Sequence, residues 1–275
     1  MKKVAVGLTV AVLAFGFAAS ADLVEDFEGM TLGSVNGQNG WSATGPYDQE
    51  VAETGGSNQA LRLSNAVASG SFGDQVFTAH SGMVAGESGS GANYDRFYGE
   101  FDFWSVTGAA QQGLSVTVSP DNGEGGRQSF IDIEDNGQGI DLLFYDYFLG
   151  AWRATYVASG LSYADTHSLG FEVMFADGYA NDLVNIYVNG SLAHTGTSWE
   201  QYYVDWQPAN VPVSVDTILF RMSGTAVSGV DGAGYYVDNF LLTASNTAPV
   251  PEPATMTLLG LGLVGMAARR FRKRG

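Results

Sequence analysis

The segment VNIYVNGSLAHT (residues 184–195) decides the fold class that the sequence predicts. Asn189-Gly190 is a dipeptide that two-residue hairpin turns favour, because both of its positions accept a positive φ. The runs on either side, residues 184–188 and 191–195, have the composition and length of short strands. We therefore expect an antiparallel hairpin here. Asp135-Asn136-Gly137 predicts a second turn of the same kind.

The same pattern recurs from residue 22 to residue 245. Short runs rich in β-branched and aromatic residues alternate with turn residues, and no segment there has a sustained helical period. In Ile131-Asp132-Ile133-Glu134 the apolar side chains share one face and the carboxylates the other. Further strands are expected at residues 23–27, 60–64, 97–106, 114–119, 128–134, 140–147, 152–158, 168–175, 213–222 and 235–243. This pattern predicts one all-β domain over residues 22–245, a two-sheet antiparallel β-sandwich of the jelly-roll type.

Three segments of this domain carry a family resemblance. Residues 23–29 (LVEDFEG), 184–190 (VNIYVNG) and 235–240 (YYVDNF) resemble the concanavalin A-like lectin/glucanase group, especially its LamG-type modules. The resemblance implies a concanavalin A-like sandwich in which the first and last strands pair. That pairing would bring Asp26 and Glu28 near Asp238.

The N-terminus has the parts of a secretory signal peptide. Lys2 and Lys3 precede an apolar run, and Ala19-Ser20-Ala21 is a small-residue cleavage site. We expect a signal peptide over residues 1–21, cleavage between Ala21 and Asp22, and export of the rest of the chain.

The C-terminus has a second three-part signal. Pro251, Glu252 and Pro253 end a linker (residues 246–253), an apolar run follows (254–268), and residues 269–275 are basic. The apolar run predicts a short transmembrane helix of roughly 22 Å, less than the roughly 30 Å hydrocarbon layer. By the positive-inside rule the basic tail stays cytoplasmic.

This order of motif, apolar run and basic tail resembles the PEP-CTERM sorting signal. The resemblance implies recognition by exosortase, transient anchoring in the inner membrane, and delivery to the cell surface or extracellular matrix. The alternative is a plain C-terminal anchor that is never processed.

The charge of the exported part limits its partners. Residues 22–245 hold five arginines, no lysine and 28 acidic residues, which give a net charge of −23. Such a surface repels nucleic acid and anionic lipid. It is compatible with neutral glycans, with cations, or with solubility alone. The chain has no cysteine, which excludes disulfides and thiol chemistry.

Catalysis is the first function to test, because the resembled group includes glucanases. Their laminarinase-like branch uses an E-x-D-x-E or E-x-D-x-x-E strand, with two carboxylates on one face. The nearest match is residues 130–134, FIDIE, in which Phe130 replaces the first carboxylate. No nucleophile elbow or H-E-x-x-H pair is present. The sequence therefore predicts a non-catalytic protein, with a divergent glycan hydrolase or lyase as the alternative.

A structural calcium ion is expected, because exported sandwiches tie strand ends through oxygen-rich sites. The first candidate set, carried over from related carbohydrate-binding sandwiches, is Asp26, Glu28 and Asp238. The second is the loop with Asp177, Asn181 and Asp182. Solvated acidic turns without an ion are the competing interpretation of both sets.

Aromatic residues provide the candidate glycan site. Residues 199–206 place Trp199, Tyr202, Tyr203 and Trp206 within eight positions, in an expected loop. Exposed rings of this kind stack on sugar faces. The competing interpretation is that the loop folds back and its rings complete the core. Trp41, Trp104 and Trp152 are expected in the core or covering a sheet face.

Together these patterns predict an exported surface or matrix protein that associates with extracellular polysaccharide. A purely structural surface protein without a ligand is the remaining alternative.

Overall fold

The computed structural model describes residues 23–45, 48–68, 75–80, 82–211, 213–222 and 225–246. The predicted cleavage residues Ala21 and Asp22 lie outside the described residues. So do the sorting residues Pro251, Glu252 and Pro253, the expected transmembrane helix and the basic tail. Within the described ranges, no helix is long and apolar enough to cross a membrane.

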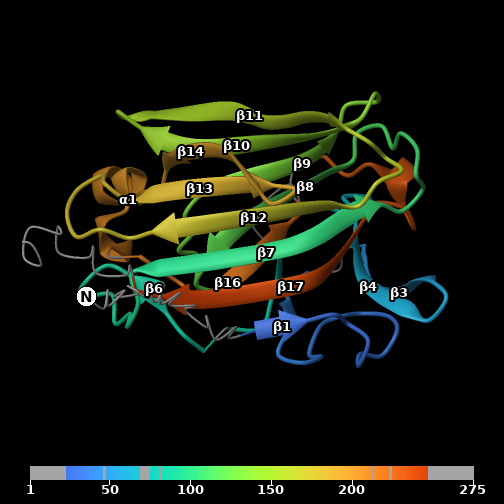
Figure 1. The fold of residues 1–275 in the computed structure, drawn as a ribbon, viewed down its shortest axis with the longest axis horizontal. Helices are drawn as coiled ribbons and strands as arrows, with labels where there is room; N and C mark the ends of the chain where they lie inside the picture. Colours follow the sequence, from blue (N-terminus) through green and yellow to red (C-terminus); the bar gives the residue numbers. More distant parts are fainter. Residues whose placement is uncertain are drawn as a thin grey trace, which may run out of the picture.

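Two antiparallel sheets pack face to face as a sandwich (Figure 1). The first sheet has the order β14 (Ser191–Thr197), β13 (Leu183–Val188), β12 (His167–Met174), β7 (Arg96–Ser105), β17 (Tyr235–Ser245), β4 (Asn58–Leu63) and β3 (Gln49–Gly55), and β1 (Leu23–Glu25) also pairs with β17. The second has the order β11 (Ala151–Leu161), β10 (Ile140–Phe148), β9 (Phe130–Asp135), β8 (Ser115–Asp121), β16 (Thr217–Arg221), β5 (Gln75–Phe77) and β2 (Ser42–Ala43). In the described residues, a short pair, β6 (Ala85–Gly86) with β15 (Ser214–Val215), a seven-residue helix, α1 (Glu200–Trp206), and two 3-10 turns, η1 (Pro208–Asn210) and η2 (Ser228–Val230), complete the elements.

The structure confirms the predicted all-β sandwich and two of its local features. Asn189 and Gly190 both have a positive φ, 51° and 72°, and connect β13 to β14 as a tight hairpin. The first and last strands pair, with Glu25 opposite Phe240. Asn239, also at positive φ, lies where the register of β17 against β7 shifts.

Three local predictions were wrong. The strand expected at residues 213–222 is divided at Asp216, because β15 pairs with β6 whereas β16 pairs with β5 and β8. The polar strand β3 was not predicted, since its sequence QEVAETG has few apolar residues. The expected loop at 199–206 contains helix α1, in which the i, i+4 spacing puts Trp199 and Tyr203 on one side.

Aromatic rings fill the space between the two sheets. Phe101 of β7 lies 5.2 Å from Phe240 of β17 and 5.4 Å from Phe220 of the opposite sheet, measured between ring centroids. Phe27 and Trp41 pack on Phe240 from the side of β1. Side chains of β7 alternate strictly between buried and partly exposed. The core therefore forms from one face of each strand.

Gly99 of β7 provides a test of this packing. It faces Phe171 of β12 in the register, and an added Cβ would lie 2.8 Å from Cε2 of that ring and 3.2 Å from Cδ1 of Ile218. We expect Gly99→Ala to lower the free energy of unfolding by about 1–3 kcal/mol, because the core is overpacked. The matched control is Gly29→Ala, where an added Cβ meets no atom within 4 Å. Urea denaturation that gives equal stabilities for the two variants would contradict this description of the core.

Candidate functional site

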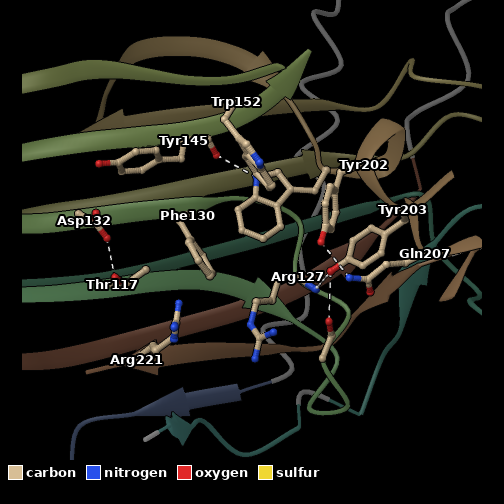
Figure 2. A pocket seen from close by; sticks show the side chains of 12 residues that line it. Thr117, Arg127, Phe130, Asp132, Tyr145, Trp152, Tyr202, Tyr203, Gln207 and Arg221 are labelled. Carbon is tan, nitrogen blue, oxygen red and sulfur yellow. Dashed lines mark hydrogen bonds between the residues drawn. The ribbon is translucent and has the colours of Figure 1, made fainter. Parts of the chain in front are cut away.

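A cavity of about 450 Å³ opens on the outer face of the second sheet, a volume within the usual range for ligand sites (Figure 2). Strands β8, β9, β10, β11 and β16, the loop before β9, and the segment around α1 provide its walls. The lining residues are Thr117, Gly125, Arg127, Phe130, Asp132, Tyr145, Trp152, Trp199, Tyr202, Tyr203, Gln207 and Arg221.

Strand alternation puts the floor of the cavity on the face opposite the core. Ile131 and Ile133 of β9 point into the sandwich, so Phe130 and Asp132 point out of it. The register places Phe130 opposite Tyr145 of β10. It also places Asp132 opposite Thr117 of β8, and Thr117 opposite Arg221 of β16. Residues from four strands therefore meet at one patch of the sheet.

The segment around α1 closes one end of this patch. The backbone N–H of Trp199 donates to the Gln128 carbonyl at 2.8 Å, and its indole Nε1–H donates to the Tyr145 carbonyl at 3.1 Å. The Tyr203 hydroxyl donates to the Gly125 carbonyl at 3.1 Å and accepts the backbone N–H of Arg127 at 2.8 Å. These bonds fix α1 to the loop before β9 and give the cavity a preformed wall.

The four aromatic candidates of residues 199–206 have different environments. Trp199 and Tyr203 are buried, at 7% and 3% exposure, in a small apolar cluster beside the main core. Tyr202 is partly exposed and lines the cavity together with them. Trp206 is 69% exposed, donates its indole N–H to the Tyr147 hydroxyl at 2.8 Å, and is not among the lining residues. Three of the four thus form the cavity wall, and the rings of Trp199 and Tyr203 are largely covered.

Trp152 is the open aromatic ring of the cavity, whereas the sequence led us to expect it in the core or covering a sheet face and not among the glycan-site candidates. It is 49% exposed on β11, with its ring centroid 4.7 Å from that of Trp199 and 5.1 Å from that of Tyr202. Trp41 is buried in the core as expected. Trp152 lies more than 45 residues before α1, so only the pairing of β11 with β10 brings it to the cluster. The sequence offered one signal for the position of Trp152, because it closely follows the turn residue Gly150. In the structure Leu149 and Gly150 both have a positive φ.

The cavity holds two arginines and, of its described lining residues, one carboxylate. Asp132 accepts a hydrogen bond from the Thr117 hydroxyl at 2.5 Å, and burial raises the pKa of Asp132 to about 6. Burial, together with the neighbouring Asp132, raises the pKa of the Tyr145 phenol to about 12. Burial and repulsion by Arg127 lower the pKa of Arg221. The guanidinium of Arg221 lies 5.6 Å from the centroid of the Phe130 ring.

The first calcium candidate set is brought together only in part. Asp238 is buried, and burial, with repulsion from Asp26 and Glu28, raises its pKa to about 6. The Glu28 carboxylate accepts the backbone N–H of Gln59 at 2.8 Å, and that of Asp26 accepts the N–H of Glu28 at 3.2 Å. The three carboxylates are neighbours in the fold, but their oxygen atoms do not all lie within 4.8 Å of one another.

The second candidate set contributes one residue to a tighter acidic group. Oxygen atoms of Glu87, Asp182 and Glu200 lie within 4.8 Å of one another. Burial, with repulsion from acidic neighbours, raises the pKa of both Glu87 and Asp182 to about 7. Asp177 and Asn181 take other roles: Asp177 accepts the backbone N–H of Ser88 at 2.8 Å, and the Asn181 side chain donates to the Asp177 carbonyl at 3.0 Å. Glu87 and Glu200 were not predicted, because Glu87 follows β6 and Glu200 begins α1, far from Asp182 and from each other in the sequence.

Comparison with known proteins supports the sorting signal and the fold. Residues 249–273 match the PEP-CTERM protein-sorting motif. Among curated proteins, no sequence matches this chain. One similar solved structure is a carbohydrate esterase from Shiga toxin-encoding bacteriophage phi24B, with a TM-score of 0.50, 15% identity, and coverage of 82% of this chain and 99% of that chain.

Two further similar structures have lower TM-scores. The calreticulin globular domain of T. cruzi has a TM-score of 0.46 at 11% identity and covers 92% of this chain and 99% of its own. Alginate lyase from Pseudomonas aeruginosa has a TM-score of 0.45 at 12% identity, with coverage of 73% and 87%. The chain is thus an exported protein that carries a PEP-CTERM motif for exosortase sorting behind a jelly-roll-like β-sandwich.

Proposed function

We propose that this protein is a non-catalytic glycan-binding component of the cell surface or extracellular matrix, and that the cavity beside α1 is its binding site. The observation that carries the proposal is the half-exposed indole of Trp152 at the edge of a preformed cavity. Sugar faces stack on such rings, and polar groups around them bond the hydroxyls. Gln207, Tyr202 and Thr117 provide such polar groups at this site.

The charges of the cavity support binding without catalysis. Glycoside hydrolysis needs two carboxylates about 5–10 Å apart on opposite sides of the scissile bond. Asp132 is the one acidic residue among the described lining residues, and Phe130 occupies the position of the first carboxylate in the resembled glucanase pattern. A lyase needs a proton acceptor instead. The phenol of Tyr145, with its pKa near 12, is poorly suited to that role at neutral pH.

A ligand-free structural protein is the competing function, and Trp152 separates the two. We expect Trp152→Ala to weaken glycan binding about tenfold or more, because a stacked ring contributes at least about 1.4 kcal/mol of contact. The matched control is Trp206→Ala, which removes an exposed indole outside the cavity. The measurement is affinity electrophoresis in gels that contain defined neutral and acidic polysaccharides. If no polysaccharide retards the wild-type protein, glycan binding is excluded for those classes and the structural function is favoured.

Calcium binding stays a prediction. The acidic group of Glu87, Asp182 and Glu200 should make the stability of the protein depend on pH. Both raised pKa values mean that the folded protein keeps protons that the unfolded chain has lost between about pH 4 and 7. Stability contributed by this group therefore falls as pH rises through that window. For buried Asp182 the loss is on the order of 2–4 kcal/mol. We expect Asp182→Asn to be less sensitive to pH than the wild type, as measured by urea denaturation at pH 4.5 and 7.5.

The same pair of proteins tests the metal. Calcium needs ionised carboxylates, so millimolar calcium at pH 8 should raise the Tm of the wild type and leave that of Asp182→Asn unchanged. Asp238→Asn serves as the parallel variant for the first candidate set. A wild-type Tm that responds neither to calcium nor to a chelator would remove calcium from both sets.

A further inference from the structure

The five arginines of the exported part are distributed unevenly. Arg62, Arg96, Arg127 and Arg153 each form an ion pair with a carboxylate; the distances are 2.5 Å for Arg62 to Asp48, 3.2 Å for Arg96 to Glu172 and 3.7 Å for Arg127 to Asp121. Two of the five, Arg127 and Arg221, line the same cavity although they lie 94 positions apart. The domain has a net charge of −23, yet two of its five arginines line one cavity of ligand size. This local concentration of positive charge calls for an explanation.

The two arginines line one side of the same cavity, and the charge of each acts on the other. The pKa of Arg221 is lowered first by burial and then by the charge of Arg127. Figure 2 shows both side chains on the same side of the cavity, below the ring of Phe130. Asp121 lies 3.7 Å from Arg127, and Asp132 favours the charged form of Arg221, but the repulsion between two partly desolvated like charges still raises the free energy of the ligand-free protein. An anionic group bound between them would lower that energy.

Both arginines are held in place by contacts with the cavity wall. The backbone of Arg127 is bound by the Tyr203 hydroxyl, and its Nε lies 3.7 Å from Oδ2 of the fully buried Asp121. Arg221 lies over the Phe130 ring, a cation–π geometry. Because these contacts exist before any ligand binds, little side-chain entropy remains to be lost on binding.

We propose that the cavity binds an acidic glycan, with a sugar carboxylate between Arg127 and Arg221 and a sugar ring on Trp152. Guanidinium groups bind carboxylates through paired, charge-assisted hydrogen bonds, which fix both position and orientation. The inference rests on the proposed glycan-binding function and names its substrate class, a uronate-containing polysaccharide. A sulfated sugar has related chemistry, and the experiment separates the two.

The negative domain makes this binding selective. A polyanion is repelled by most of the surface, so only a chain that enters the cavity gains from the arginines. Net charge alone favours neutral glycans as partners, but the local arrangement of charge at the cavity points to an anionic sugar unit. Screening of the domain charge by salt should assist approach, whereas the arginine contacts in the cavity weaken only partly.

The experiment is isothermal titration calorimetry of the purified protein with oligogalacturonate, oligoguluronate, sulfated dextran oligomers and neutral dextran oligomers. We expect the two oligouronates to bind, and Arg221→Gln and Arg127→Gln each to weaken that binding by about tenfold or more. Arg221→Lys keeps the charge and loses the paired geometry, so its loss should be smaller than that of Arg221→Gln. Arg96→Gln is the matched control, because it makes the same change in net charge on the other sheet. Thermal unfolding of each variant confirms that it is folded.

The possible outcomes separate the substrate class from the proposed function. Trp152-dependent binding of neutral dextran, unchanged in both glutamine variants, would overturn the acidic-glycan inference and leave glycan binding intact. Preferential binding of sulfated dextran would mean that the arginines recognise a sulfate and not a carboxylate, which would overturn the uronate assignment. Absence of binding to every oligosaccharide overturns the uronate inference and counts against the glycan-binding function for these classes.

Asp132 provides a pH test of the same site. The groups that face its carboxylate are Thr117 of β8, Glu134 of β9, Tyr145 of β10 and Arg221 of β16. Below about pH 6 the protonated Asp132 no longer repels a sugar carboxylate, which itself stays ionised. We expect oligouronate affinity to rise severalfold from pH 7.5 to 5.5, and Asp132→Asn to remove most of this dependence. An affinity for oligouronate that falls when the pH is lowered from 7.5 to 5.5 in the wild type would contradict the charge arrangement proposed for the cavity.

Discussion

Burial of aromatic rings between two sheets is the constraint on which the rest of this structure depends. Phe101 and Phe240 of the first sheet meet Phe220 of the second, and Gly99 leaves the space that the Phe171 ring occupies. With period-two alternation, each strand that contributes to this layer must direct its other side chains outward. The core therefore also decides which residues the outer face of the second sheet presents, including Phe130, Asp132, Thr117 and Arg221.

The cavity arises because a short helical segment covers only part of that outer face. Trp199 attaches the segment to the Tyr145 carbonyl, and Tyr203 attaches it to Gly125 in the loop between β8 and β9. Their rings are mostly covered by this attachment, so they shape the site more than they contact a ligand. The exposed ring is that of Trp152, which lies on β11 at the edge of the second sheet. The division between supporting and exposed rings follows from this geometry.

The net charge of the domain is negative, whereas the described residues that line the cavity carry more positive than negative charges. The excess of acidic residues gives the exported domain a net negative charge, from which we expect repulsion of nucleic acid and anionic lipid. Locally, two arginines converge on a cavity with one described carboxylate, while acidic side chains converge around Glu87 and Asp182. Folding thus separates a positively charged cavity from an acidic group, although the chain as a whole is strongly negative.

The family resemblance implied the pairing of the first and last strands. The sequence by itself determined the all-β class, the hairpin at Asn189-Gly190 and the sorting motif. These depend on local turn chemistry, on alternation, or on contiguous residues, all of which are visible in one dimension. Only the tertiary structure decided that Trp152, Arg127 and Arg221 share a cavity and that Glu87 and Glu200 join Asp182. It also decided that Trp199 supports the wall while Trp206 faces solvent. The reason is that sheet register and loop packing bring together residues whose separation along the chain carries no signal of their contact.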